Sequence, residues 1–223
     1  MEVKNVYIPD FETNRNEFGK IYDLFDGSIL LFDPTDVQRE NAYTNLQRKF
    51  SGARLNLICH SSGCNYGIRI ASDVLKKGGN LSINKVVFIA PTIMPVSRSE
   101  RRQIRMSNME NGDNNERVFN FKKMALKCIG KGLSYRSRRK IQSNLVESRS
   151  MNISNGDVFV PNVSALVITS CGDERVSPKS IKLIENSPLF VTEIVNINGT
   201  SHNPLLDVDN GSKLVKQINL FLK

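Results

Sequence analysis

Residues 59–64 read CHSSGC and contain side chains that could serve as a nucleophile and a base. They follow a short apolar run and precede a helix-like stretch at 64–77. A serine hydroxyl is a weak nucleophile until a neighbouring base takes its proton. A sharp strand-to-helix turn exposes such a hydroxyl and places the next backbone N–H where an oxyanion forms. The turn needs small residues two positions before and after the serine, so Ser61, between Cys59 and Gly63, fits better than the serine that follows it.

The pattern small-His-Ser-x-Gly resembles the nucleophile elbow of the α/β-hydrolase superfamily, in which the nucleophile, the acid and the histidine follow in that order. Asp173 lies just after the apolar run 165–170, in a segment that resembles the superfamily's acid loop, and Glu174 is the alternative. His202 lies in NGTSHNP, which resembles the loop that presents the histidine. The resemblance covers roughly residues 4–94 and 163–223.

This resemblance implies a serine hydrolase that cleaves a carboxylic ester or a thioester. Ser61 would attack the carbonyl carbon, His202 would accept its proton, and Asp173 would orient the imidazole. Such chemistry needs no cofactor. The chain has two histidines and no CxxC pair, so its sequence also predicts no metal site.

The resemblance also implies two backbone donors to the oxyanion. The first would be the N–H of Ser62, and the second would come from the loop after the first strand, at Asp10 or Phe11. Many superfamily members carry His-Gly in that loop, and glycine normally stands where this chain has Cys59. These departures leave an alternative open, in which the fold is catalytically inactive and binds an acidic partner or a membrane surface.

The elements that must position these residues alternate along the chain. Strand-like runs occupy residues 5–9, 28–34, 55–59, 85–91, 165–170 and 190–197. Helix-like runs occupy residues 16–25, 35–50, 64–77, 177–186 and 211–223. Short, continuously apolar strands between helices are typical of a parallel sheet covered on both faces. The sequence therefore predicts an α/β fold with a mostly parallel central sheet flanked by helices.

A basic segment interrupts this alternation. Residues 97–140 contain 13 Lys and Arg against 4 Asp and Glu, while the rest of the chain has 18 of each. We expect a core formed by residues 1–94 and 156–223, with a basic helical lid at 95–155. Residues 117–133 have the pattern of an amphipathic basic helix. The cations assigned to partner binding are Arg101, Arg102, Arg105, Lys122, Lys123, Lys127, Arg138, Arg139 and Lys140.

Several roles for the insert remain open. It could be a solvated lid over the active site, or it could dock an acidic acyl carrier protein that delivers a thioester. It could also bind an anionic membrane surface or an acidic small substrate. Nucleic acid is disfavoured because the positive charge comes without a recognisable binding motif.

Length and composition indicate the number of domains and the cellular compartment in which this chemistry would take place. The 223 residues suit one α/β domain, and 39% hydrophobic residues provide for a sizeable core. The sequence has no apolar run of about 18 residues and no recognisable signal peptide. Its four cysteines show no paired spacing, which favours reduced thiols and a cytoplasmic protein.

Overall fold

The computed structural model describes residues 2–10, 20–22, 24–25, 29–31, 42–93, 99–100, 102–103, 163–199, 201–207 and 210–223. The described strands are β1 (Val3–Ile8), β2 (Ile29–Leu31), β3 (Arg54–His60), β4 (Ser82–Ile89), β5 (Val163–Ser170) and β6 (Phe190–Ile197). The described helices are α2 (Ala42–Phe50), α3 (Gly63–Lys77), α7 (Pro178–Glu185), the short 3-10 helix η1 (Pro204–Leu206) and α8 (Gly211–Leu222).

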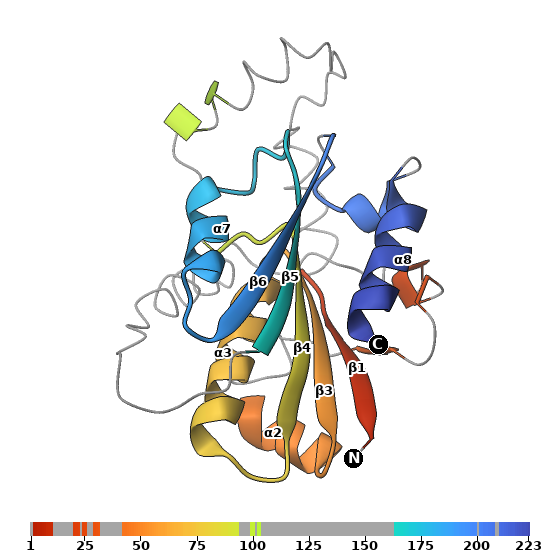
Figure 1. Ribbon diagram of the computed structural model, residues 1–223, viewed down its shortest axis with the longest axis vertical. Coiled ribbons are helices and arrows are strands. Elements are labelled where there is room, and N and C mark those ends of the chain that lie inside the picture. The colour runs from red at the N-terminus through yellow and green to blue at the C-terminus, as the bar shows by residue number, and fades with distance from the viewer. Residues whose placement is uncertain are drawn as a thin grey trace, which may run out of the picture.

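These strands form one parallel sheet in the order β2-β1-β3-β4-β5-β6 (Figure 1). Its central strands are buried, as their continuously apolar sequences predict: Val6 pairs with Leu57, Leu57 with Val86, and Val86 with Ala165. Parallel neighbours require crossover connections, and helices supply them between β3 and β4 and between β5 and β6. The predicted α/β class and the parallel sheet are therefore confirmed.

Helices cover both faces of the sheet. Figure 1 shows α2, α3 and α7 on one side and α8 on the other. On the first face, α3 buries Ile70 and Val74 in the same apolar cluster as residues of α2 and α7. On the second face, α8 packs Leu214 and Ile218 in a separate cluster that also contains Ile21. The sheet thus lies between two apolar clusters, and the ends of its strands position the side chains that follow them.

Most of the predicted insert at 95–155 lies outside the described residues. So do eight of the nine cations assigned to partner binding, namely Arg101, Arg105, Lys122, Lys123, Lys127, Arg138, Arg139 and Lys140. Arg102 is described as a helical, exposed residue. Among the helices that the structure describes, none combines the length and the apolar character needed to cross a membrane.

Candidate active site

Ser61 occupies a strained turn between β3 and α3. Its φ angle is 54°, in the left-handed region that side chains other than glycine seldom adopt. The turn is held by the Ser61 N–H, which donates to the Ile89 carbonyl at 2.9 Å, and by the Cys64 N–H, which donates to the Ser61 carbonyl at 3.1 Å. A Cβ on Gly63 would lie 2.3 Å from the Ile8 carbonyl oxygen, so only glycine fits there. This is the geometry expected of a nucleophile elbow.

Cys59, two residues before Ser61, stands where the superfamily pattern has glycine. Its side chain is fully buried, and its Sγ lies 2.3 Å from the position that a Cβ on Gly67 would take. Gly67 belongs to α3 and faces β3 across this contact. In the superfamily pattern, a glycine on the strand lets the helix approach closely. In this chain the glycine that allows this approach is Gly67 on the helix.

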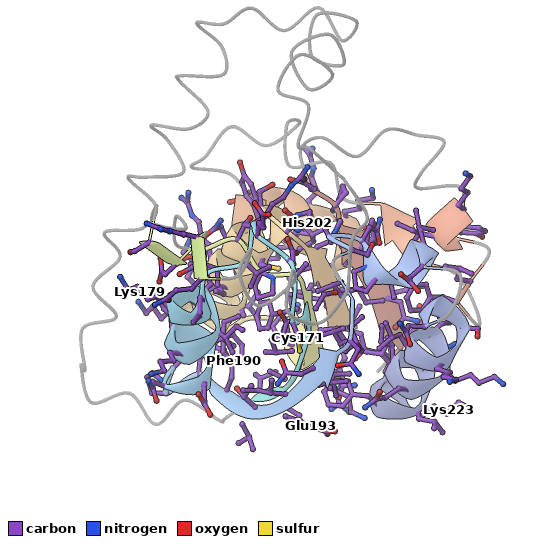
Figure 2. All side chains as sticks on the ribbon, turned by 90° about the horizontal axis from the view of Figure 1, so that it is seen from above. Cys171, Lys179, Phe190, Glu193, His202 and Lys223 are labelled. Atoms are coloured by element: carbon purple, nitrogen blue, oxygen red, sulfur yellow. The ribbon has the colours of Figure 1, made fainter. Side chains whose placement is uncertain are left out.

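His202 brings the three sequence-predicted side chains into one hydrogen-bonded chain. Its Nδ1 lies 2.6 Å from Asp173 Oδ2, and its Nε2 lies 2.7 Å from Ser61 Oγ. The carboxylate accepts from Nδ1–H, which leaves the Nε2 lone pair of a neutral imidazole facing the serine hydroxyl. Figure 2 shows the molecule from above the view of Figure 1, with His202 labelled.

Asp173 is fixed in a tight turn after β5. Its N–H donates to the Ser170 carbonyl at 3.1 Å, and its Oδ1 accepts from the Arg175 N–H at 2.9 Å. Its side chain is only 2% exposed, against 15% for His202. Asp173, rather than the alternative Glu174, therefore contacts the histidine through a preorganised carboxylate.

The loop that carries His202 is bonded to the turn that carries Asp173. The Ser170 hydroxyl donates to the Ser201 carbonyl at 2.8 Å, and the Gly172 N–H donates to the Gly199 carbonyl at 2.9 Å. Parallel pairing of β5 and β6 brings these two strand ends together. The acid and the histidine are thus positioned as one unit.

His60, the residue before Ser61, is buried and makes a long-range contact. It is 4% exposed, and its Nε2 lies 2.9 Å from the carbonyl oxygen of His202. Burial lowers the pKa of His60, and the nearby His202 lowers it further, against smaller opposing effects of Asp10 and Asp173. His60 is therefore held as the neutral imidazole.

The region predicted to bind the oxyanion contains a buried carboxylate. Ser62 immediately precedes α3, so its backbone lies at the positive end of the helix dipole. Its hydroxyl donates to Asp10 Oδ1 at 2.5 Å, and Asp10 is buried. The sequence predicted Asp10 only as a candidate backbone donor, and did not predict this contact of its side chain with Ser62. Phe11, the other candidate donor, lies outside the described residues.

Thr92 also lies at the site, and sequence reasoning missed it. It follows β4, and its hydroxyl is 3.3 Å from Ser61 Oγ. Its N–H donates to the Ser61 carbonyl at 3.4 Å. Threonine in a loop has no motif of its own. Its position just after a strand adjacent to β3 is the one signal that could have identified it.

The cysteines near the elbow, Cys59 and Cys64, are fully buried packing residues. Burial raises the pKa of the Cys59 and Cys64 thiols well above the usual range, so neither becomes a thiolate near neutral pH. Within the described part of the chain, no three His, Cys, Asp or Glu side chains are grouped as metal ligands would be.

No family model matches the chain, and no curated protein matches it in sequence. Solved structures do match it. A monoacylglycerol lipase from Paleococcus ferrophilus is 14% identical, with a TM-score of 0.60 over 98% of this chain and 93% of that one. Human thioesterase 2 is 15% identical, with a TM-score of 0.58 over 100% of this chain and 96% of that one.

ClbQ from the colibactin NRPS/PKS pathway is 11% identical, with a TM-score of 0.58 over 99% of this chain and 96% of that one. At such identities the likeness concerns the fold and leaves the reaction open. It agrees with the parallel sheet flanked by helices that the structure shows. The chain has the α/β-hydrolase fold.

Proposed function

We propose that this protein is a serine hydrolase that cleaves a carboxylic ester or thioester. The observation that carries the proposal is the continuous chain from Ser61 Oγ through the His202 imidazole to Asp173, with bonds of 2.7 and 2.6 Å. The three residues come from three different strand ends. A chance surface histidine has no reason to meet both a buried carboxylate and a strained serine at hydrogen-bond distance.

In the proposed reaction, Ser61 Oγ attacks the substrate carbonyl while His202 Nε2 takes the hydroxyl proton. The resulting imidazolium is stabilised by Asp173 and then protonates the leaving alcohol or thiol as the carbon–oxygen or carbon–sulfur bond breaks. Water repeats the sequence on the acyl-enzyme: His202 removes a proton from it, the acid product forms, and Ser61 regains its hydrogen. Atoms and charges balance without a cofactor.

The proposed oxyanion site lies between the elbow and the loop after β1. The Ser62 N–H stands at the N-terminus of α3, where backbone donors and the helix dipole favour negative charge. The carbonyls of Ile8 and Pro9 pass close to Gly63. This approach supports the loop after β1 as the source of the second donor, with Asp10 as the described candidate and Phe11 outside the described residues.

An acyl thioester on an acidic carrier protein is the substrate we favour. The charge excess of residues 97–140 supports it, because a basic lid beside the site would attract such a carrier. The free thiols of Cys59, Cys64 and Cys171 support a reducing, cytoplasmic setting.

A fluorophosphonate probe read by intact mass tests the proposed nucleophile. We expect one label on the wild-type protein and none on Ser61→Ala or His202→Ala. Ser212→Ala, an exposed serine on α8, is the matched control and should label like the wild type. A folded wild-type protein that takes no label would contradict the proposal and favour the catalytically inactive binding protein.

A comparison of three substrates tests whether the protein prefers a carrier-bound thioester. Hydrolysis of one acyl group is measured as its p-nitrophenyl ester, as its N-acetylcysteamine thioester and on an acidic acyl carrier protein. We expect the carrier-bound thioester to have the highest kcat/KM and to lose this advantage at high salt, which screens the charges. Equal salt dependence for all three substrates would contradict recognition of the carrier.

A further inference from the structure

His60 connects the strand of the nucleophile to the loop of the proposed base. It is the last residue of β3, next to Ser61, and its Nε2 lies 2.9 Å from the backbone carbonyl of His202. The two imidazole rings lie 5.5 Å apart at a 42° tilt. A carbonyl oxygen can only accept, so Nε2 of His60 must carry the hydrogen.

The other ring nitrogen of His60 fixes its protonation state. Nδ1 is buried and has no hydrogen-bond partner among the described residues. A protonated ring would bury a second N–H without an acceptor, which is unfavourable. The charged groups around the ring are Asp10, Asp173 and, when protonated, His202. Burial and His202 lower the pKa of His60, and together they outweigh the two carboxylates, which raise it. His60 is thus a neutral Nε2–H donor.

The direction of this hydrogen bond gives it a role that the other loop contacts do not have. The bonds from Ser170 to Ser201 and from Gly172 to Gly199 fix the His202 loop to the end of β5. The His60 bond instead runs to β3, the strand that ends at Ser61. It therefore sets how far the His202 imidazole stands from the serine hydroxyl.

We propose that His60 is a positioning residue, which holds His202 against Ser61 by donating Nε2–H to the His202 carbonyl. The role rests on the proposed hydrolase function, because it concerns the geometry between nucleophile and base. Catalytic groups misplaced by about 1 Å can lose on the order of 100-fold in rate. His60 touches neither the substrate nor the reacting atoms, so its effect should fall on kcat and spare KM.

Two substitutions separate the donor from the ring. In His60→Gln the side-chain amide can place an N–H near the position of Nε2, whereas His60→Leu fills similar space without a donor. With p-nitrophenyl butyrate, we expect kcat of His60→Leu to fall about 10- to 100-fold and that of His60→Gln to fall less than about 5-fold. KM should change less than about 3-fold in both.

A kcat for His60→Leu within 2-fold of the wild type would overturn the proposal. So would an equal loss in both variants, because the donor would then not be what matters. Thermal unfolding of each variant confirms that the assay temperature lies below its transition. Active sites counted with the fluorophosphonate probe express kcat per functional serine.

NMR provides a readout that does not depend on activity. The chain has only two histidines, so selective ¹⁵N-histidine labelling gives two imidazoles, and each His60 variant retains His202 alone. We expect His60 as the neutral Nε2–H tautomer throughout pH 6–8. The His202 ring signals should move in His60→Leu and stay near their wild-type positions in His60→Gln.

An Nδ1–H tautomer for His60, or unchanged His202 signals in His60→Leu, would overturn the positioning role. A wild-type protein that takes no probe and hydrolyses no ester would instead refute the hydrolase function, and with it a role in catalysis. The NMR result would still decide whether His60 holds the His202 loop. The two failures are therefore distinguishable.

Discussion

Adding one methyl group at Gly67 should strain the elbow through Cys59. Gly67 lies on α3, and an alanine Cβ there would stand 2.3 Å from Cys59 Sγ and 3.3 Å from Cys59 Cβ. Cys59 is fully buried, so its thiol has no open space to rotate into. Gly67→Ala must therefore displace either the helix or the strand that leads to Ser61.

Two opposing contributions determine how much Gly67→Ala changes the free energy of unfolding. Nonbonded heavy atoms prefer separations of about 3.5–4.0 Å, so the new contact is short by more than 1 Å, and overpacking of this kind costs about 1–3 kcal/mol. Alanine in place of glycine in a helix returns about 1 kcal/mol. We expect Gly67→Ala to lower the free energy of unfolding by up to about 2 kcal/mol, or Tm by up to about 8 °C.

A double-mutant cycle isolates this contact. Cys59→Ala removes Sγ and leaves the 3.3 Å contact to Cβ, which small shifts relieve. In that background Gly67→Ala should be neutral or stabilising by up to about 1 kcal/mol, because the helix gains alanine without the clash. The coupling energy between the two sites should then be about 1–3 kcal/mol.

Urea unfolding of the wild type, both single variants and the double variant measures the cycle. Ester hydrolysis by the same four proteins should follow it, because Ser61 lies two residues beyond Cys59. Equal costs of Gly67→Ala in the wild type and in Cys59→Ala would refute the reasoning, since the cost would then have nothing to do with the thiol.

Two further predictions concern the buried polar groups of the elbow. Burial lowers the pKa of His60 in the folded protein. Below about pH 6.5 this histidine therefore binds a proton in the unfolded chain but not in the folded one. Acidification should then reduce the free energy of unfolding by up to about 1.4 kcal/mol per pH unit. Urea unfolding between pH 5 and 8 should show this loss in the wild type and not in His60→Gln; parallel pH curves would contradict it. Ser62→Ala removes the donor to Asp10 and should cost about 1–3 kcal/mol, and less in an Asp10→Asn background, where no buried charge loses a partner. Equal costs in both backgrounds would show that the carboxylate does not depend on the Ser62 hydroxyl.

The strands could be predicted from local apolar runs, and Ser61, Asp173 and His202 from short motifs that resemble those of the α/β-hydrolase superfamily. Apolar runs such as Leu166–Ile168 are buried on both faces of the sheet, and each candidate residue comes shortly after such a run. Parallel strands place their carboxyl ends on one edge, so residues after β3, β5 and β6 lie on the same side of the sheet, where the loops can bring them together. The pairing of Ser61 with Asp173 and His202 came from the resemblance to the α/β-hydrolase superfamily, and this rule explains why it is compatible with the fold.

The supporting contacts could not be predicted in the same way. The His60 bond to His202 joins residues 142 positions apart, and the Ser62 bond to Asp10 joins residues 52 positions apart. These contacts depend on side-chain rotamers and on loop paths of a few ångströms, which no periodicity encodes. Thr92 was missed for the same reason, since its hydroxyl reaches Ser61 through the path of the chain after β4.

Cys59 shows why a departure from a motif need not count against its function. The first glycine of the pattern serves to let strand and helix pass closely, and this requirement concerns the space between the two elements rather than one position. Here the strand carries the larger residue and the helix carries Gly67, so the approach is preserved and Ser61 keeps its left-handed conformation. A chain with Cys59 and any larger residue at position 67 would lose that space. The identity of residue 67 is therefore as informative about this elbow as the residue two positions before the serine.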